Sequence, residues 1–267
     1  MAEVLVRYTV AAGVATITLD SPSNRNALST PLIHQCVEAL RAAEDDDTVR
    51  VVLLSHTGPV FCSGADLKET AAARVAGQVP AAALADLLAA LVECPKPVVA
   101  RVAGSARAGG LGVIAAADIA VCTTAASFAF TEVRLGVVPA VISATVLPRL
   151  RPRAAAELYL TGEKFDGHRA QSIGLVTAAV TQSELDGVVA NYLEALLMGA
   201  PGALTGVKEL LRTGGSGVGD HASFHSRLAK LAELSARYFL SPEGREGVRA
   251  FTEKRPPYWV PERDATP

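Results

Sequence analysis

The chain has 267 residues, and its 25 Lys and Arg residues against 27 Asp and Glu residues give a formal charge of −2 at pH 7. Half of the residues are hydrophobic and 19 % are charged, a composition that excludes an intrinsically disordered chain. The slight acidic excess argues against nucleic-acid binding, which normally needs a basic face. This length predicts one large domain, or a core with a small appendage.

The first elements are predicted from alternating and periodic apolar residues. Runs rich in Val, Ile and Thr at 3–9 and 14–19 predict two strands joined as a hairpin. An amphipathic helix is expected over about 30–43. Short, continuous apolar runs, typical of strands buried on both faces, follow at 51–55, 97–102, 118–122 and 174–180. Helical patterns separate these runs, which predicts mostly parallel pairing in α/β layers.

The C-terminal part of the chain has a different pattern. From about Asn191 onward only helical periodicity occurs. We therefore predict an α/β core over residues 1–195 and a C-terminal helical region over 196–267. The mean hydropathy of +0.29 is high for a monomer and favours apolar surface hidden between subunits.

Targeting signals and redox chemistry are the next features. No run of 18 apolar residues occurs, so no membrane span is expected, and early charges disfavour a signal peptide. The four cysteines lie far apart, without metal-ligand spacing, as expected for reduced thiols in the cytoplasm. The motifs for dinucleotides, nucleotide triphosphates and a serine nucleophile elbow are absent. We therefore expect no cofactor and no metal.

Two glycine-bearing segments each lead from a buried strand into a helix. They are residues 61–69, Phe-Cys-Ser-Gly-Ala-Asp-Leu-Lys-Glu, and residues 102–112, Val-Ala-Gly-Ser-Ala-Arg-Ala-Gly-Gly-Leu-Gly. Backbone N–H groups at a helix start lack intrahelical acceptors and carry the positive end of the helix dipole. Two such amides that converge on one point would hold an oxyanion. Taken alone, each segment is more often an ordinary strand-to-helix turn.

A third segment, residues 127–133, places a carboxylate in apolar surroundings. Its period of two predicts that Glu132 shares a face with Phe128 and Phe130. Desolvation of the charged form raises the pKa of such a carboxyl group and suits it to acid–base chemistry. The alternative is a structural carboxylate that pairs with Arg134 or caps the next helix.

Together, these segments resemble the crotonase (enoyl-CoA hydratase/isomerase) superfamily over almost the whole chain. The resemblance also includes Asn-Arg-Asn-Ala-Leu at 24–28, Leu-Gly-Val-Val-Pro at 135–139 and the tail segment 246–255. It is closest to bacterial methylglutaconyl-CoA-type and general enoyl-CoA hydratases. The resemblance implies an α/β, crotonase-like spiral of ββα units, with a C-terminal helical region that builds homotrimers or hexamers.

The same resemblance implies an acyl-CoA thioester as the substrate, so that coenzyme A is part of the substrate and not a cofactor. The thioester oxygen would lie between the backbone N–H groups of Ala65 and Gly109, and Glu132 would transfer the proton. Phe251 and Lys254 would lie near the adenine and phosphates, in reach of a neighbouring subunit. The full set of implied substrate and coenzyme A contacts is Arg25, Ala27, Ser63, Gly64, Asp66, Leu67, Lys68, Gly110, Phe251 and Lys254.

One catalytic position departs from the family pattern. Typical hydratases carry two glutamates; Glu132 matches one, whereas Gly112 stands where the other belongs. The closest branch implies a lyase that adds water across C2=C3. A single carboxylate also suits an isomerase, which moves one proton between C2 and C4. Decarboxylation, thioester hydrolysis and a catalytically silent acyl-CoA binder are further alternatives.

Overall fold

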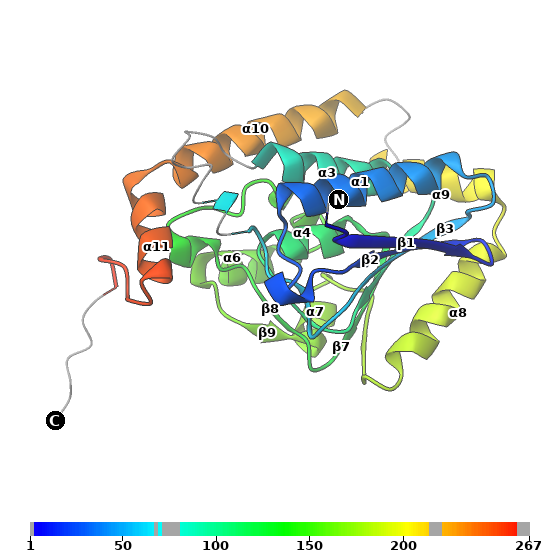
Figure 1. Cartoon of the computed structure of the whole chain (residues 1–267), viewed down its shortest axis with the longest axis horizontal. Coiled ribbons are helices and arrows are strands. Elements are labelled where there is room, and N and C mark those ends of the chain that lie inside the picture. The colour runs from blue at the N-terminus through cyan, green and yellow to red at the C-terminus, as the bar shows by residue number, and fades with distance from the viewer. Residues whose placement is uncertain (1–2, 67–68, 71–80, 214–220, 261–267) are drawn as a thin grey trace.

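A computed structural model describes residues 3–66, 69–70, 81–213 and 221–260, and it confirms the predicted α/β class (Figure 1). In the described part, the strands form a six-stranded sheet, in the order β1-β2-β3-β5-β7-β10, and a four-stranded sheet, in the order β4-β6-β8-β9. The elements of the larger sheet are β1 (Val6–Ala11), β2 (Val14–Leu19), β3 (Val51–His56), β5 (Val98–Val102), β7 (Ile119–Thr123) and β10 (Ala178–Val180).

The larger sheet follows the sequence prediction closely. β1 and β2 form the expected antiparallel hairpin, and every further neighbour pairs in parallel. On β3, both Val51 and Val52 are buried although they point to opposite faces, as predicted for a strand covered on both sides. β10 begins at residue 178 rather than 174, because Gly174 adopts a positive φ of 91° in the preceding turn.

The smaller sheet was not predicted. It consists of β4 (Val60–Cys62), β6 (Ser105–Arg107), β8 (Ser127–Ala129) and β9 (Phe165–Asp166). Strands of two or three residues are too short to produce a readable alternation. The period of two predicted over 127–133 is wrong beyond Ala129, because Glu132 begins the 3₁₀-helix η2 (Glu132–Leu135).

Helices cover both faces of the larger sheet (Figure 1). α1 (Thr30–Asp45) begins at the Ser29 cap and buries Leu32, Cys36 and Leu40 along one face, close to its predicted range. It packs beside α3 (Ala81–Glu93), over which α10 (His221–Phe239) lies. On the opposite face, α8 (Leu185–Leu197) contacts Val51, Val99 and Val121 of the sheet.

The remaining helices include short elements near the smaller sheet and two helices of the C-terminal region. They are η1 (Pro22–Asn24), α4 (Gly109–Ala116), α5 (Ser143–Val146), α6 (Pro152–Thr161), α7 (Gly167–Ser172), α9 (Pro201–Thr213) and α11 (Pro242–Thr252). The boundary expected at 195–196 falls inside α8, and the division into core and tail stays a prediction. Among the described residues, no single helix is long and apolar enough to cross a membrane, although the bent pair of α8 and α9 reaches that length and composition jointly.

Candidate active site

Three parallel strands of the smaller sheet end at the same edge. β6 lies between β4 and β8, with Val60 aligned to Ser105 and Ala106 aligned to Phe128. The chain leaves β4 toward Ala65, leaves β6 toward Gly109 and leaves β8 toward Glu132. Because carboxyl ends of parallel strands meet at one edge, the three segments singled out in the sequence are brought together.

The two glycine-bearing turns touch each other at this edge. Gly64 has a φ of +92°, and a Cβ added to it would lie 3.0 Å from the Cβ of Ala108 and 3.2 Å from the carbonyl oxygen of Arg107. Ala108, which precedes α4, has a strained φ of 46°. Neither the amide of Ala65 nor that of Gly109 donates a hydrogen bond to another described residue. Both amides can therefore serve an external acceptor.

The segment at 24–28 holds the first turn in place. The amide of Ser63 donates to the carbonyl oxygen of Arg25 at 3.1 Å, and the amide of Leu28 donates to that of Gly64 at 2.8 Å. The side chain of Asp66 accepts from the amide of Glu69 at 3.1 Å, as a helix-capping residue does. These bonds fix the backbone on both sides of Ala65.

Asn26 is a structural residue of the site that the sequence analysis did not single out. Its side chain is fully buried, and its Oδ1 accepts from the amide of Ser21 at 2.8 Å. Its Nδ2 donates to the carbonyl oxygens of Thr57 at 3.0 Å and Val60 at 2.8 Å. Asn26 thus ties the loop before α1 to the start of β4. The sequence signal for this role was an asparagine within the segment at 24–28, because its short amide side chain suits hydrogen bonds to backbone groups.

Glu132 lies in dry surroundings. The residue is 9 % exposed, and its Oε2 is buried without a hydrogen-bond partner. Burial raises the pKa of its carboxyl group to about 7, although its own backbone N–H opposes the shift. Fully buried Phe130 lies nearby in the chain, with its ring centroid 4.6 Å from that of Tyr159. Burial, and secondarily the charge of Glu132, also raises the pKa of the Tyr159 hydroxyl.

The position of the second family glutamate is filled by an aliphatic side chain. Gly112 lies in α4, and a Cβ added there would be 2.5 Å from the Cγ2 atom and 2.8 Å from the Cβ atom of Ile142. Ile142 is itself buried. The space beside Gly112 is therefore packed, and the described residues near it supply no second carboxylate.

The other predicted contacts are distributed over several elements. Ala27 and Gly110 are buried, and an added Cβ at Gly110 would lie 2.8 Å from the Cβ of Cys62, which shows how closely α4 packs on β4. Phe251 and Lys254 are exposed at the end of α11. Leu67 and Lys68 lie outside the described residues. No group of three or more His, Cys, Asp or Glu residues in the described ranges is arranged to hold a metal ion.

The chain is similar to known proteins over almost its whole length. The family profile described as enoyl-CoA hydratase/isomerase matches residues 9–262. A probable enoyl-CoA hydratase from Rhodobacter capsulatus is 33 % identical over 96 % of this chain and 97 % of its own length. A putative enoyl-CoA hydratase from Thermus thermophilus is 34 % identical over 91 % and 96 %. The crystal structure of a putative enoyl-CoA hydratase from Mycobacterium avium paratuberculosis superimposes with a TM-score of 0.85 at 45 % identity, covering 97 % of this chain and 100 % of that one.

Proposed function

The chain belongs to the enoyl-CoA hydratase/isomerase, or crotonase, family, and from this premise we propose that it adds water across the C2=C3 bond of an acyl-CoA thioester. One observation carries the proposal. The edge formed by β4, β6 and β8 presents two amides without acceptors, those of Ala65 and Gly109, and the unpartnered carboxylate oxygen of Glu132.

The proposed chemistry gives each of these groups a role. The amides of Ala65 and Gly109 bind the thioester oxygen, on which negative charge develops in the transition state. The ionised Glu132 accepts a proton from water as the water oxygen bonds to C3. The electron pair of C2=C3 moves into the enolate, and Glu132 then returns the proton to C2. One carboxylate therefore suffices for the whole addition.

The packing of Gly112 against Ile142 favours double-bond isomerisation as a second candidate. Because this packing leaves no room for a second carboxylate, Glu132 is the group of the described site that can move a proton. An isomerase needs this group only to remove a proton at C2 and return it at C4. Both candidates require Glu132 to start ionised, so they differ in substrate and product rather than in the state of the protein.

Product analysis with defined thioesters tests the proposal. The protein is incubated with crotonyl-CoA, a 3-enoyl-CoA and 3-methylglutaconyl-CoA. The products are separated by liquid chromatography; mass identifies hydrated, decarboxylated and hydrolysed products, and the absorbance of the conjugated thioester distinguishes the two double-bond isomers, which have equal mass. We expect hydration of at least one 2-enoyl thioester, with loss of its conjugated absorbance. Isomerisation of the 3-enoyl thioester without hydration would select the second candidate. Acyl-CoA binding without turnover would identify a silent binder and overturn the proposal.

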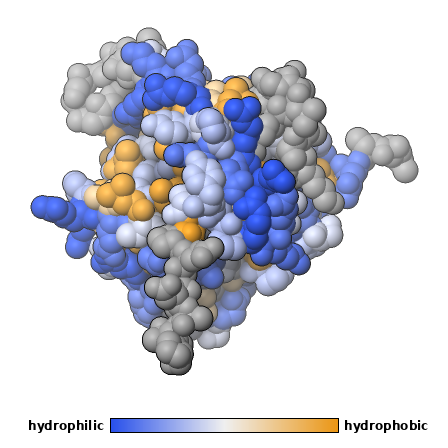
Figure 2. All heavy atoms as spheres, turned by 90° about the vertical axis from the view of Figure 1, so that its left-hand side faces the viewer, coloured by the Kyte–Doolittle hydropathy of each residue, from blue (hydrophilic) through white to orange (hydrophobic). Residues whose placement is uncertain are grey.

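We also propose that the protein is a homotrimer or hexamer in the cytoplasm. The outer side of α9 carries exposed Val207, Leu210 and Leu211, and the face with α6 and α11 exposes apolar side chains among hydrophilic ones (Figure 2). Such surface is typical of contacts between subunits. The four buried free cysteines suit a reducing compartment. Native mass spectrometry that found a monomer at micromolar concentration would contradict the oligomer.

A further inference from the structure

The tail helix α11 packs against the turn η2 with backbone against backbone. A Cβ added to Gly247 of α11 would lie 2.2 Å from the carbonyl oxygen of Leu135. From the other side, a Cβ added to Gly136 would lie 2.5 Å from the carbonyl oxygen of Glu243. Neither contact involves the tip of a flexible side chain, so any added atom must displace α11 or η2 as a unit.

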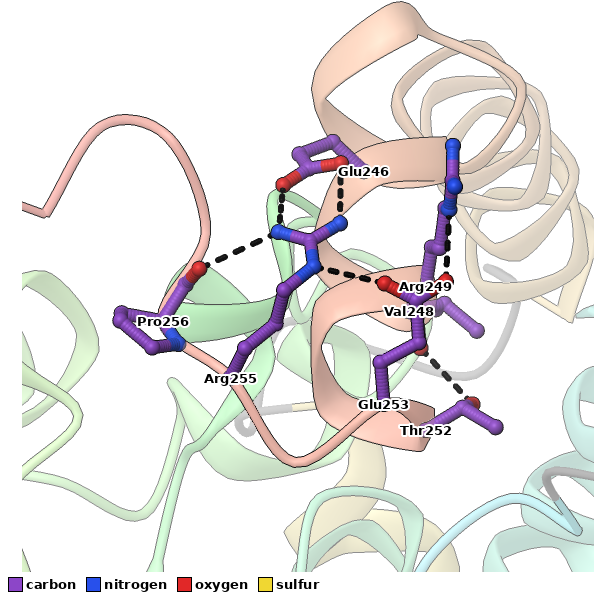
Figure 3. A network of polar contacts seen from close by, with 7 residues as sticks. All are labelled: Glu246, Val248, Arg249, Thr252, Glu253, Arg255 and Pro256. Atoms are coloured by element: carbon purple, nitrogen blue, oxygen red, sulfur yellow. Dashed lines mark hydrogen bonds and ion pairs between the residues drawn. The ribbon is translucent and has the colours of Figure 1, made fainter.

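Two charged side chains of α11, Glu246 and Arg249, are paired with the charged residues that follow the helix. Arg255 donates to both carboxylate oxygens of Glu246, at 2.6 Å and 3.1 Å, and to Glu253 at 2.6 Å (Figure 3). Arg249 donates to the other oxygen of Glu253 at 2.8 Å. The buried positions of α11 are Gly244, Gly247, Val248 and Ala250, which carry no titratable side chain. The contact of α11 with η2 therefore acts through shape and exclusion of water and not through charge.

The turn η2 links this contact to Glu132. Glu132 is its first residue, and its carbonyl oxygen accepts from the amide of Val137 at 3.1 Å. Because this hydrogen bond closes η2 into one turn, a displacement of the Leu135 backbone also displaces Glu132. Tyr159 of α6 is a titratable group that interacts electrostatically with Glu132. Arg134 of η2 is instead hydrogen-bonded to Thr161 and Glu163.

We propose that α11 is a positioning element for Glu132, and that Gly247 is the residue whose missing side chain allows the helix to hold η2 against the site. The inference rests on the proposed function, in which Glu132 moves the proton. It adds a positioning role for the tail: α11 keeps the carboxylate of Glu132 oriented and out of water, and Gly247 itself does not touch the substrate.

The variant Gly247→Ala tests this role, with Gly187→Ala as the matched control. Both changes replace a helical glycine, but a Cβ added to Gly187 of α8 meets no atom within 4 Å. The first readout is the titration of the Glu132 carboxyl carbon by NMR in full-length protein labelled with ¹³C-glutamate, assigned by comparison with Glu132→Gln. The second is the pH dependence of kcat/KM, with kcat and KM determined separately.

In Gly247→Ala we expect the pKa of Glu132 to fall toward the ordinary glutamate value, and kcat to fall by about 10- to 100-fold. Gly187→Ala should change neither. A folded Gly247→Ala protein with unchanged titration overturns the inference, because a merely destabilising change lowers the active fraction without moving the pKa. If Gly247→Ala does not fold, Val248→Ala provides the same test. It removes packing atoms from α11 and adds none that would overlap η2. The titration needs no substrate, so it separates failure of this inference from failure of the proposed function.

Discussion

Arg134 lies two residues after Glu132 on the same turn, yet its guanidinium turns away from that carboxylate. Its Nε and Nη2 atoms both donate to the carbonyl oxygen of Thr161 at 3.2 Å, and Nη2 also pairs with Glu163. The structural alternative in which Arg134 neutralises Glu132 is therefore wrong. Without a cationic partner among the described residues, the charged form of Glu132 is disfavoured by desolvation alone.

Replacing Glu132 by Gln should separate catalysis from folding. The amide keeps the shape but exchanges no proton, so kcat should fall by about 10²–10⁴-fold. Glu163→Gln, a change of the same kind on an exposed side chain, should leave kcat close to wild type. Full activity of Glu132→Gln on the best substrate would show that another group is the base.

The direction of the stability change in Glu132→Gln follows from the pKa of Glu132. The pKa of Glu132 is about 7 in the folded chain against an ordinary value of 4.5, so the folded state binds the proton more tightly. Stability from this group is present below pH 4.5 and is lost as the pH rises to 7. At pH 8, thermal unfolding should therefore occur at an equal or higher temperature in Glu132→Gln than in the wild type. A clearly lower melting temperature would indicate a bonding role for the carboxylate.

The rate of the wild-type enzyme should depend on pH through the same group. Because the proposed reaction starts from the ionised carboxylate, kcat/KM should be low in acid and reach a plateau above a midpoint near 7. The measurement is a pH profile with a substrate that does not itself titrate in this range. A midpoint near the ordinary glutamate value would show that Glu132 is solvated in the working enzyme.

The three segments of the site were predictable, whereas the reason they meet was not. Glycines before a helix start and a carboxylate that follows Phe128 and Phe130 are local patterns that a sequence displays. The sheet that aligns them consists of strands of two or three residues, and its pairing joins residues such as Val60 and Ser105 that are distant in the chain. The close packing of Ile142 against Gly112 was equally hidden, because α4 and the segment before α5 show no shared pattern.

The turn that presents the Ala65 amide can be tested through Gly64. Gly64→Ala combines a φ of +92° with contacts at 3.0–3.2 Å to the neighbouring turn, so it should displace the amide. Loss of one oxyanion donor should lower kcat by about 10²–10³-fold. Gly13→Ala imposes a similar strain, at φ +81°, in the turn between β1 and β2 away from the site and should lower stability without this loss. Equal kcat in the two variants would argue against Ala65 as a donor.

The Gly112 and Ile142 pair makes a prediction about a second carboxylate. Gly112→Glu alone should lower stability, because overpacking typically costs about 1–3 kcal/mol. In the double variant with Ile142→Ala, the total loss should be smaller than the sum of the two single losses, as measured in a denaturant-based double-mutant cycle. Additive losses would mean that the two residues are not in contact.

Lys254 offers a test of the predicted coenzyme A contact. It has a φ of 55° at the end of α11, where the amide of Arg255 donates to Ala250 and that of Lys254 donates to Phe251, a pattern that favours glycine. Lys254→Gly should therefore raise stability by up to about 1 kcal/mol in thermal unfolding. If the ammonium group binds the phosphates, KM for the acyl-CoA should rise while kcat changes little. An unchanged KM would remove Lys254 from the substrate contacts.

The parallel pairing of β4, β6 and β8 has a consequence for how the protein reaches its native state. Parallel neighbours cannot pair through a tight turn, and each pairing here closes a long stretch of intervening chain. Helices such as α1 can form from local contacts before these loops close. The oxyanion amides and the carboxylate are brought together by these long-range pairings, so catalytic activity requires the smaller sheet to have closed and cannot arise from the local helices alone.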